Sequence, residues 1–339
     1  MARPRIVVSS WVHREVLDRL AAVGEVVAND SRETLSPDEL RARCRDAEAL
    51  MAFMSDRVDD SFLSACPDLK VIACALKGYD NFDADACERR GVWLTIVPDR
   101  LTIPTAELAI GLMIGLGRNV LPGDRLVRSG HFRGWRPILY GRGLEGSTVG
   151  LIGMGAVGQA IARRLIGFEA RVLYADRFAL PSDQETALRA HRVSRDELRR
   201  QSDFILLCLP LAADTLGLVD AAFLTEVKRG AFLINIARGS LVDEAAVAQA
   251  VETGQLGGYA ADAFALEDWA LDGRPDRLDE RLRQATDQTL FTPHLGSAVD
   301  EVRRDIALEA ATSLIEALRG EVPSGAVNRP SAVRNRSVA

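Results

Sequence analysis

The chain has 339 residues, of which 47% are hydrophobic and 27% are charged, and its formal net charge is −6. This length is typical of two domains, and the composition is that of a folded globular protein rather than a disordered one. A mildly acidic chain without a block of Lys or Arg offers no electrostatic footprint for a nucleic acid or an anionic membrane. An anionic ligand must therefore be bound by a local pocket.

Five cysteines are scattered along the chain: Cys44, Cys66, Cys74, Cys87 and Cys208. They form no C-x-x-C pair, so they predict neither a disulfide framework nor a metal site. The N-terminal MARPRIVVSS has too short an apolar run for a signal peptide. The longest apolar stretch, Leu101–Leu116, contains Pro104 and Glu107 and falls short of a membrane-spanning helix. We therefore expect a cytoplasmic protein.

The first hundred residues alternate short β-branched runs with helical stretches. The predicted strands are RIVVSS, GEVVAN, ALMAFM, KVIACAL and VWLTIV. This alternation predicts a parallel sheet with helices on both faces. A helix follows at about 105–120, and it is too apolar to face water on all sides. We expect such a helix to lie at a subunit interface, which predicts a homodimer.

A second α/β run begins at Ser147, and its six predicted strands are TVGLIG, RVLYA, FILLCLP, AFLINIA, GYAADAF and LFTPH. The amphipathic stretch 299–318 then predicts a helix that has no strand of its own to cover. We expect this helix to pack back on the first module, which makes the first domain discontinuous. The predicted domains are 1–100 plus 296–325, then 101–295, with a loose tail at 326–339.

The second module carries a glycine-rich motif of the G-x-G-x-x-G type at Gly153, Gly155 and Gly158. It follows a predicted strand and opens a helix, and Asp176 ends the next strand 18 residues after Gly158. A glycine-rich turn without a ligand is the structural alternative. The complete context instead predicts a Rossmann domain whose turn approaches a pyrophosphate. Asp176 favours NAD by repelling a 2′-phosphate, and Arg177 predicts weaker use of NADP.

Five polar or ring-bearing residues follow predicted strands: Lys77, Pro210, Arg238, Glu267 and His294. Each has a structural alternative, such as a surface lysine, a solvated loop acid or a histidine satisfied at a strand end. Their shared position at the carboxyl ends of strands is more informative, because ligands bind at that edge of open α/β sheets. This edge is therefore the predicted active site.

Four segments resemble the family of NAD-dependent D-isomer-specific 2-hydroxyacid dehydrogenases: GMGAVG, ARGSLVDEAAV, GYAADAF and TPHLGSA. Within this family, MAFM, CALKGYDNFD, GWRPILYG and ALEDW are similar to the phosphite-oxidising (phosphonate) dehydrogenases. The similarity runs from about Arg5 to Ala317. It implies a flavodoxin-like substrate domain and an NAD-binding Rossmann domain. It also implies that phosphite, NAD and water give phosphate and NADH.

The resemblance also implies residue roles. Arg238 would hold the oxyanion, His294 would be the acid–base, and Glu267 would orient the imidazole. The implied substrate contacts are Met54, Lys77, Gly78, Trp135, Tyr140 and Arg303. The implied cofactor contacts are Lys77, Thr105, Gly153, Gly155, Ala156, Val157, Gly158, Asp176, Leu209, Pro210, Ile236, Ala237, Arg238, Asp262 and His294. Whether His294 or Arg238 activates the attacking water stays open, as do the adenine-side contacts.

Charge separates the candidate substrates, because phosphite is largely a dianion near neutral pH and a 2-hydroxy acid is a monoanion. Lys77 and Arg238 together match a dianion. One added charge pair at ~4 Å contributes up to ~4 kcal/mol at an effective dielectric near ~20, before desolvation. Oxidation of a 2-hydroxy acid or formate is the alternative. A non-catalytic NAD-sensing protein is a third, and Glu267 with His294 argues against it.

Overall fold

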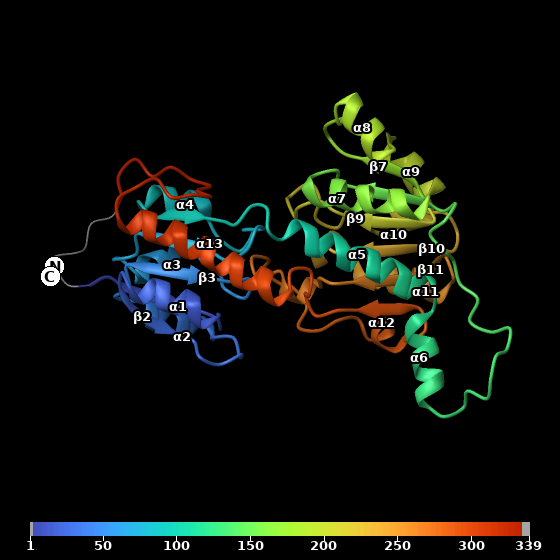
Figure 1. Ribbon diagram of the computed structural model, residues 1–339, viewed down its shortest axis with the longest axis horizontal. Coiled ribbons are helices and arrows are strands. Elements are labelled where there is room, and N and C mark those ends of the chain that lie inside the picture. The colour runs from blue at the N-terminus through green and yellow to red at the C-terminus, as the bar shows by residue number, and fades with distance from the viewer. Residues whose placement is uncertain (1–2, 334–339) are drawn as a thin grey trace. The chain divides into compact units, whose positions relative to one another are not determined.

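The computed structural model describes residues 3–333, and the chain divides into two units that are each described by themselves (Figure 1). Unit 1 consists of the described residues up to Leu101, Trp269–Asp272, and those from Ala298 onward. Unit 2 consists of Thr102–Asp268 and Gly273–Ser297. Each unit is built on a parallel sheet with covering helices, which confirms the predicted fold class.

Unit 1 contains a five-stranded parallel sheet in the order β2-β1-β3-β4-β5. Its strands are β1 (Arg5–Val8), β2 (Glu25–Ala28), β3 (Ala49–Ala52), β4 (Val71–Cys74) and β5 (Trp93–Thr95). Its helices are α1 (Arg14–Ala21), α2 (Pro37–Cys44), α3 (Asp60–Ala65), α4 (Ala84–Arg89) and α13 (Asp300–Leu318). Three of these helices, α2, α3 and α4, have N-terminal caps. The capping side chains of Ser36, Asp59 and Asp83 each accept a hydrogen bond from a backbone N–H in the first turn.

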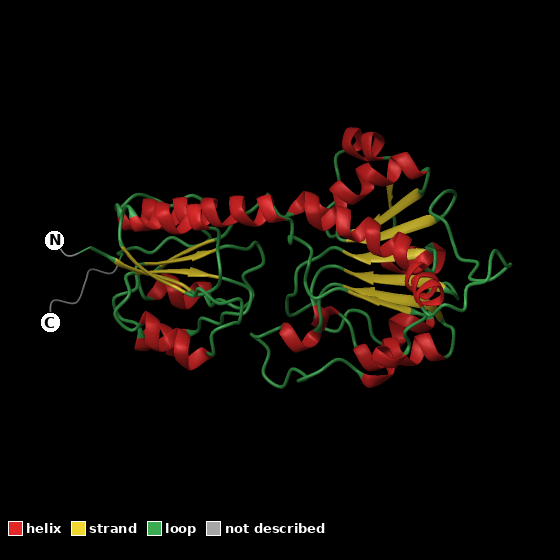
Figure 2. Cartoon of the chain, turned by 60° about the horizontal axis from the view of Figure 1, so that its bottom comes forward, coloured by secondary structure: helices red, strands yellow, loops and turns green. Residues whose placement is uncertain are grey.

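The two faces of this sheet are covered by different helices, as Figure 2 shows. Side chains alternate along each strand, so Val8 and Met51 pack toward α1 and α13, while Val7 and Leu50 pack toward α2, α3 and α4. The inner strands β3 and β4 are buried on both faces, which accounts for their continuous apolar runs in the sequence.

The segment that follows α13 differs from the predicted loose tail. The described part of that tail returns to β5, where the Val327 N–H donates to the Leu94 carbonyl (2.9 Å). The side chain of Asn328 is buried, and it bonds both the Leu94 N–H (2.9 Å) and the Val92 carbonyl (2.9 Å). These bonds order a polar stretch because β5 otherwise lacks a partner on that side. Residues 334–339 lie outside the described residues.

Unit 2 contains a seven-stranded parallel sheet in the order β12-β11-β10-β9-β6-β7-β8. Its strands are β6 (Thr148–Ile152), β7 (Arg171–Ala175), β8 (Ala190–Arg192), β9 (Phe204–Leu207), β10 (Ala231–Asn235), β11 (Leu256–Ala261) and β12 (Thr289–Phe291). Its α-helices are α5 (Thr102–Gly117), α6 (Val120–Arg128), α7 (Ala156–Leu165), α8 (Ser182–Leu188), α9 (Arg195–Gln201), α10 (Ala221–Thr225), α11 (Glu244–Glu252) and α12 (Glu280–Gln284). Three single turns of 3₁₀-helix complete it: η1 (Ile166–Phe168), η2 (Gly239–Leu241) and η3 (Ala265–Glu267).

The apolar helix that we expected at a subunit interface is α5, and most of its apolar side chains are buried inside unit 2. Ala106, Ala109, Leu112 and Met113 pack on the sheet and on α7. Burial within the chain therefore explains the composition of α5, and this composition no longer argues for a second subunit.

The sequence predicted six strands for this unit, and β8 is the one that it missed. β8 lies in LPSDQETALRAHRV, which carries no β-branched run. Among residues 3–333, no helix has the length and apolar character that crossing a membrane requires.

Candidate active site

The glycine-rich turn lies between β6 and α7, and its geometry fits a pyrophosphate. Gly153 has a φ of +99°, and a Cβ there would lie 2.5 Å from the Cys208 carbonyl oxygen. A Cβ on Gly158 would clash with the Gly153 carbonyl oxygen, so the first turn of α7 packs closely on the strand. A Cβ on Gly155 would meet no other heavy atom within 4 Å, which leaves open space at the start of α7. Helix N–H groups beside such a space are suited to a diphosphate.

Asp176 follows β7 and is held by the backbone on both sides. One carboxylate oxygen accepts the Met154 N–H (2.7 Å), and the other accepts the Phe178 N–H (3.1 Å). Each oxygen retains a second acceptor position, which a ribose hydroxyl can use. Arg177 forms an ion pair with Asp214, so its guanidinium is already engaged in the chain.

A cavity of about 770 Å³ adjoins this carboxylate. Gly153, Leu209 and Pro210 line one part of it, as the sequence predicts for cofactor contacts. Arg192, Ser194 and Arg195 line it as well, and the sequence did not single them out. The sequence shows several arginines after Asp176, which could have indicated these residues. Because strand β8 was not predicted, the sequence did not show that this segment pairs with β7 beside the cavity.

His294 and Glu267 form a close pair at the carboxyl edge of the unit 2 sheet. The imidazole Nδ1 lies 2.7 Å from one Glu267 carboxylate oxygen. The other oxygen of Glu267 accepts the Phe264 N–H (2.8 Å), which fixes the carboxylate in η3. An ionised carboxylate only accepts hydrogen bonds, so Nδ1 is the donor of this bond and Nε2 is the nitrogen left for another partner. His294 has a φ of +56°, a conformation that few residues other than glycine adopt.

Asp262 follows β11 and holds the loop that carries His294. It is 2% exposed, and burial raises the pKa of its carboxyl. Its carboxylate accepts the Thr292 hydroxyl (2.6 Å), the Leu295 N–H (2.6 Å) and the Gly296 N–H (2.8 Å). Its backbone carbonyl accepts the His294 N–H (3.0 Å). These bonds place Asp262 under the loop that carries His294, and its implied contact with the nicotinamide carboxamide stays a prediction.

Arg238 follows β10 at the same edge and is half-buried. The next residue, Gly239, lies so close to η3 that a Cβ there would clash with the Phe264 carbonyl carbon. The buried carboxylate of Asp268 also accepts the Ser240 N–H (2.6 Å). The turn that carries Arg238 is thus packed against the turn that carries the glutamate. Gly239 and Asp268 were not predicted, although both directly adjoin predicted residues.

Unit 1 gathers four of the predicted substrate residues at the carboxyl edge of its own sheet. Met54 follows β3, Lys77 and Gly78 follow β4, and these two strands are direct neighbours. Arg303 of α13 donates to the Ala75 carbonyl (3.4 Å), two residues before Lys77. Burial lowers the pKa of the Arg303 guanidinium. Lys77 itself is partly exposed at the end of its strand.

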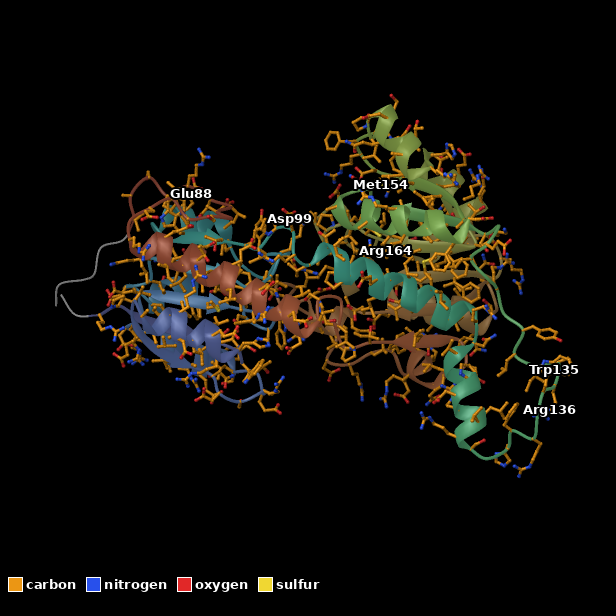
Figure 3. The ribbon with its side chains drawn as sticks, viewed as in Figure 1. Glu88, Asp99, Trp135, Arg136, Met154 and Arg164 are labelled. Atoms are coloured by element: carbon orange, nitrogen blue, oxygen red, sulfur yellow. The ribbon has the colours of Figure 1, made fainter. Side chains whose placement is uncertain are left out.

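Trp135 lies on the segment between α6 and β6 (Figure 3). Its side chain is 83% exposed, and that of Tyr140 on the same segment is 77% exposed. Asn119, just beyond the C-terminal end of α5, donates to the Tyr140 carbonyl (3.4 Å). Thr105 lies near the other end of α5, where a Cβ on Gly296 would be 3.2 Å from its hydroxyl. Helix rise separates these two ends by ~18 Å. The structure therefore does not bring Trp135 or Tyr140 to the His294 of their own unit, and their substrate role stays a prediction.

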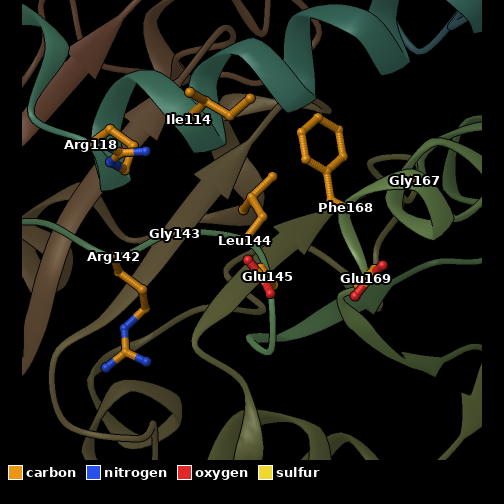
Figure 4. A pocket seen from close by; sticks show the side chains of 9 residues that line it. All are labelled: Ile114, Arg118, Arg142, Gly143, Leu144, Glu145, Gly167, Phe168 and Glu169. Carbon is orange, nitrogen blue, oxygen red and sulfur yellow. The ribbon is translucent and has the colours of Figure 1, made fainter.

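A second cavity, of about 480 Å³, lies at the opposite edge of unit 2 (Figure 4). Arg118, Arg142, Glu145 and Glu169 give its lining both signs of charge. Arg142 is already paired with Asp203 (2.8 Å). The lining contains no predicted site residue, so the candidate active site is the carboxyl edge.

Comparisons with known proteins identify relatives over almost the whole chain. Residues 110–296 match the family model described as "D-isomer specific 2-hydroxyacid dehydrogenase, NAD binding domain". A glyoxylate reductase of Pyrococcus furiosus is 34% identical over 332 residues, which is 96% of each chain. The TT0316 protein of Thermus thermophilus superposes with a TM-score of 0.85 at 34% identity, covering 95% of this chain and 99% of the other. A glyoxylate reductase of Paecilomyes thermophila does so at 0.83 and 26% identity, covering 96% and 99%.

Proposed function

Because the chain belongs to the D-isomer-specific 2-hydroxyacid dehydrogenases, a family of NAD-binding oxidoreductases, we propose that it oxidises phosphite to phosphate with NAD. The observation that carries this proposal is Lys77, which stands at the carboxyl end of β4 beside the strand that leads to Met54. Lys77 supplies a cation for an anionic substrate, and the resemblance gives the same role to the guanidinium of Arg238. Two cations match a dianion better than a monoanion.

The proposed reaction transfers the hydrogen on phosphorus as a hydride and replaces it with a water oxygen. When bound, the oxidised nicotinamide accepts that hydride. His294 Nε2 has the free lone pair and takes a proton from the attacking water. Glu267 stabilises the resulting imidazolium through its 2.7 Å bond to Nδ1. The balance is phosphite, NAD and water giving phosphate, NADH and one proton.

Reduction of glyoxylate, or oxidation of a D-2-hydroxy acid, is the second candidate. It is favoured by the names of the relatives, since those at 34% identity over 96% of the chain are glyoxylate reductases. Arg238 would then bind the substrate carboxylate, and His294 would exchange a proton with the substrate oxygen. The histidine–glutamate pair supports both candidates equally.

One spectrophotometric experiment separates the two. NADH formation is followed with phosphite, D-lactate, D-glycerate and formate, and NADH consumption is followed with glyoxylate. The first proposal expects phosphite to have the highest kcat/KM. A kcat/KM for glyoxylate or a hydroxy acid that exceeds the value for phosphite would overturn it.

We propose NAD as the preferred cofactor, with weaker use of NADP. The Asp176 carboxylate beside the cavity supports NAD, because it would repel a 2′-phosphate. Arg177, Arg192 and Arg195 line the same cavity and would lower that repulsion.

We also propose a cytoplasmic homodimer that binds small anions. The described structure holds all five cysteines as free thiols, which suits a reducing compartment. The exposed side chains of Trp135, Ile138 and Tyr140 offer apolar surface for a second copy. Light scattering at micromolar concentration tests the dimer, and a monomeric mass would contradict it.

A further inference from the structure

A buried carboxylate lies at the carboxyl edge of the unit 1 sheet, near the predicted substrate residues. Asp56 follows β3 and is 3% exposed. One of its oxygens, Oδ2, accepts the Phe53 N–H (2.8 Å) and also a short hydrogen bond from the Ser9 hydroxyl. Its own N–H donates to the Phe53 carbonyl (3.1 Å), which closes the turn 53–56. The side chain of Asp56 thus ties this turn to the residue that follows β1.

The surroundings of Asp56 make an ionised carboxylate costly. No ion pair of this carboxylate is found among residues 3–333. The titratable groups that face it are the thiols of Cys44 on α2 and Cys74 on β4, and burial raises the pKa of both. Burial also raises the pKa of Asp56 to about 6. An apolar side chain at this position would stabilise the core at least as well as a buried carboxylate. The presence of Asp56 therefore needs an explanation other than packing.

The turn that Asp56 closes supports the predicted substrate residues. Met54 is part of the turn, and the Met54 carbonyl accepts a hydrogen bond from Asn81 (2.9 Å). The ring of Phe53 lies under the guanidinium of Arg303, with 5.9 Å between the guanidinium carbon and the ring centroid. Arg303 in turn bonds the Ala75 carbonyl on the segment that leads to Lys77. A displacement of the turn would therefore move Met54 directly and Arg303 through the Phe53 ring.

We propose that Asp56 is a positioning residue for the anionic substrate: its buried carboxylate fixes the turn 53–56, and the turn fixes Met54 and Arg303. This inference rests on the proposed function, since it takes Met54, Lys77 and Arg303 as substrate-binding residues. Asp56 itself touches neither the substrate nor the cofactor.

The test compares the wild type with Asp56→Ala, and with Asp85→Ala as a matched control. Asp85 is an exposed residue in the first turn of α4. Alanine removes the oxygen that accepts both the Phe53 N–H and the Ser9 hydroxyl, so for D56A we expect a rise of about tenfold or more in KM for the anion that the wild type turns over, equivalent to ~1.4 kcal/mol. The KM for NAD and kcat should stay within about threefold, because unit 2 is unchanged. Ser9→Ala, which keeps the bond to Phe53, should give a smaller rise and remains available if D56A does not fold.

A second readout does not depend on activity. The Phe53 N–H is bonded directly to Asp56, so its hydrogen exchange should accelerate in D56A while β1 and β4 stay protected. An unchanged substrate KM, or unchanged exchange at Phe53, would overturn the inference. A wild type that turns over none of the anions would instead overturn the proposed function, and the exchange measurement would still decide the role of Asp56.

Discussion

The backbone N–H of Met154 donates to the carboxylate of Asp176 across 2.7 Å, which ties the glycine-rich turn to the end of the neighbouring strand β7. The residue that we propose to discriminate between the two nicotinamide cofactors therefore also braces the turn that we propose to bind their shared diphosphate. Charge and geometry at Asp176 can be separated by substitution.

Asp176→Asn keeps an oxygen acceptor but removes the negative charge. We expect the ratio of kcat/KM for NADP to that for NAD to rise by about tenfold or more, because a 2′-phosphate is no longer repelled. Asp183→Asn, an exposed change on α8, is the control and should leave the ratio as in the wild type. An unchanged ratio in D176N would show that Asp176 does not face the ribose.

His294→Asn tests the acid–base. Asparagine tolerates the positive φ of this position, so the loop should keep its course while the imidazole is lost. We expect kcat to fall by about 10²–10⁴-fold with cofactor affinity nearly unchanged, as read by fluorescence titration of NADH. His131→Asn, on the exposed segment after α6, is the matched control. Near-normal kcat in H294N would remove His294 from the chemistry and favour Arg238 as the group that activates water.

Glu267→Gln removes the charge beside the imidazole and leaves one acceptor oxygen, which can serve either the Phe264 N–H or the imidazole Nδ1 in the present geometry. We expect a fall in kcat of about 10–100-fold, smaller than that of the histidine variant, since the imidazole itself is retained. Glu267→Ala should be worse, because it also frees the η3 turn. Equal effects of Gln and Ala would show that the charge of Glu267, and not the position of the turn, decides the rate.

Lys77→Ala should raise the KM for phosphite by about 10–100-fold and change kcat less, because the variant lacks the positive charge that we propose to bind the dianion. Lys77→Arg keeps the charge but not the shape, and should recover part of the loss. The same variants should change the KM for glyoxylate by a smaller factor. A KM for phosphite that does not respond to K77A excludes Lys77 from substrate binding.

Asp56 predicts how stability depends on pH in unit 1. Its pKa is about 6 in the folded protein, above the ordinary 3.8, so the folded state binds more protons between these values. The free energy of unfolding should therefore fall as pH rises from about 4 to about 6, by about 2 kcal/mol relative to D56N. Urea unfolding of both proteins at the two ends of this window measures the difference. A difference that does not change with pH would mean that Asp56 titrates normally.

Strand identity and the carboxyl-edge residues were predictable from the sequence, because buried parallel strands are uninterrupted apolar runs and Arg238, Glu267 and His294 follow them directly. Contacts between residues that are far apart in the sequence were not predictable. Asp56 lies in an irregular turn whose partner, Ser9, follows a different strand. The course of the segment that carries Trp135 depends on anchors at the end of α5, which no local pattern reveals.

The segment that pairs with β5 shields the edge of the unit 1 sheet. The Val327 N–H occupies the Leu94 carbonyl and the Asn328 side chain occupies the Leu94 N–H, and both groups would otherwise be open to a strand from another molecule. Trimming the chain before Ala326 should therefore promote aggregation while leaving the reacting groups in place. Affinity tags and shortened forms intended for crystallisation are best designed with that edge kept covered.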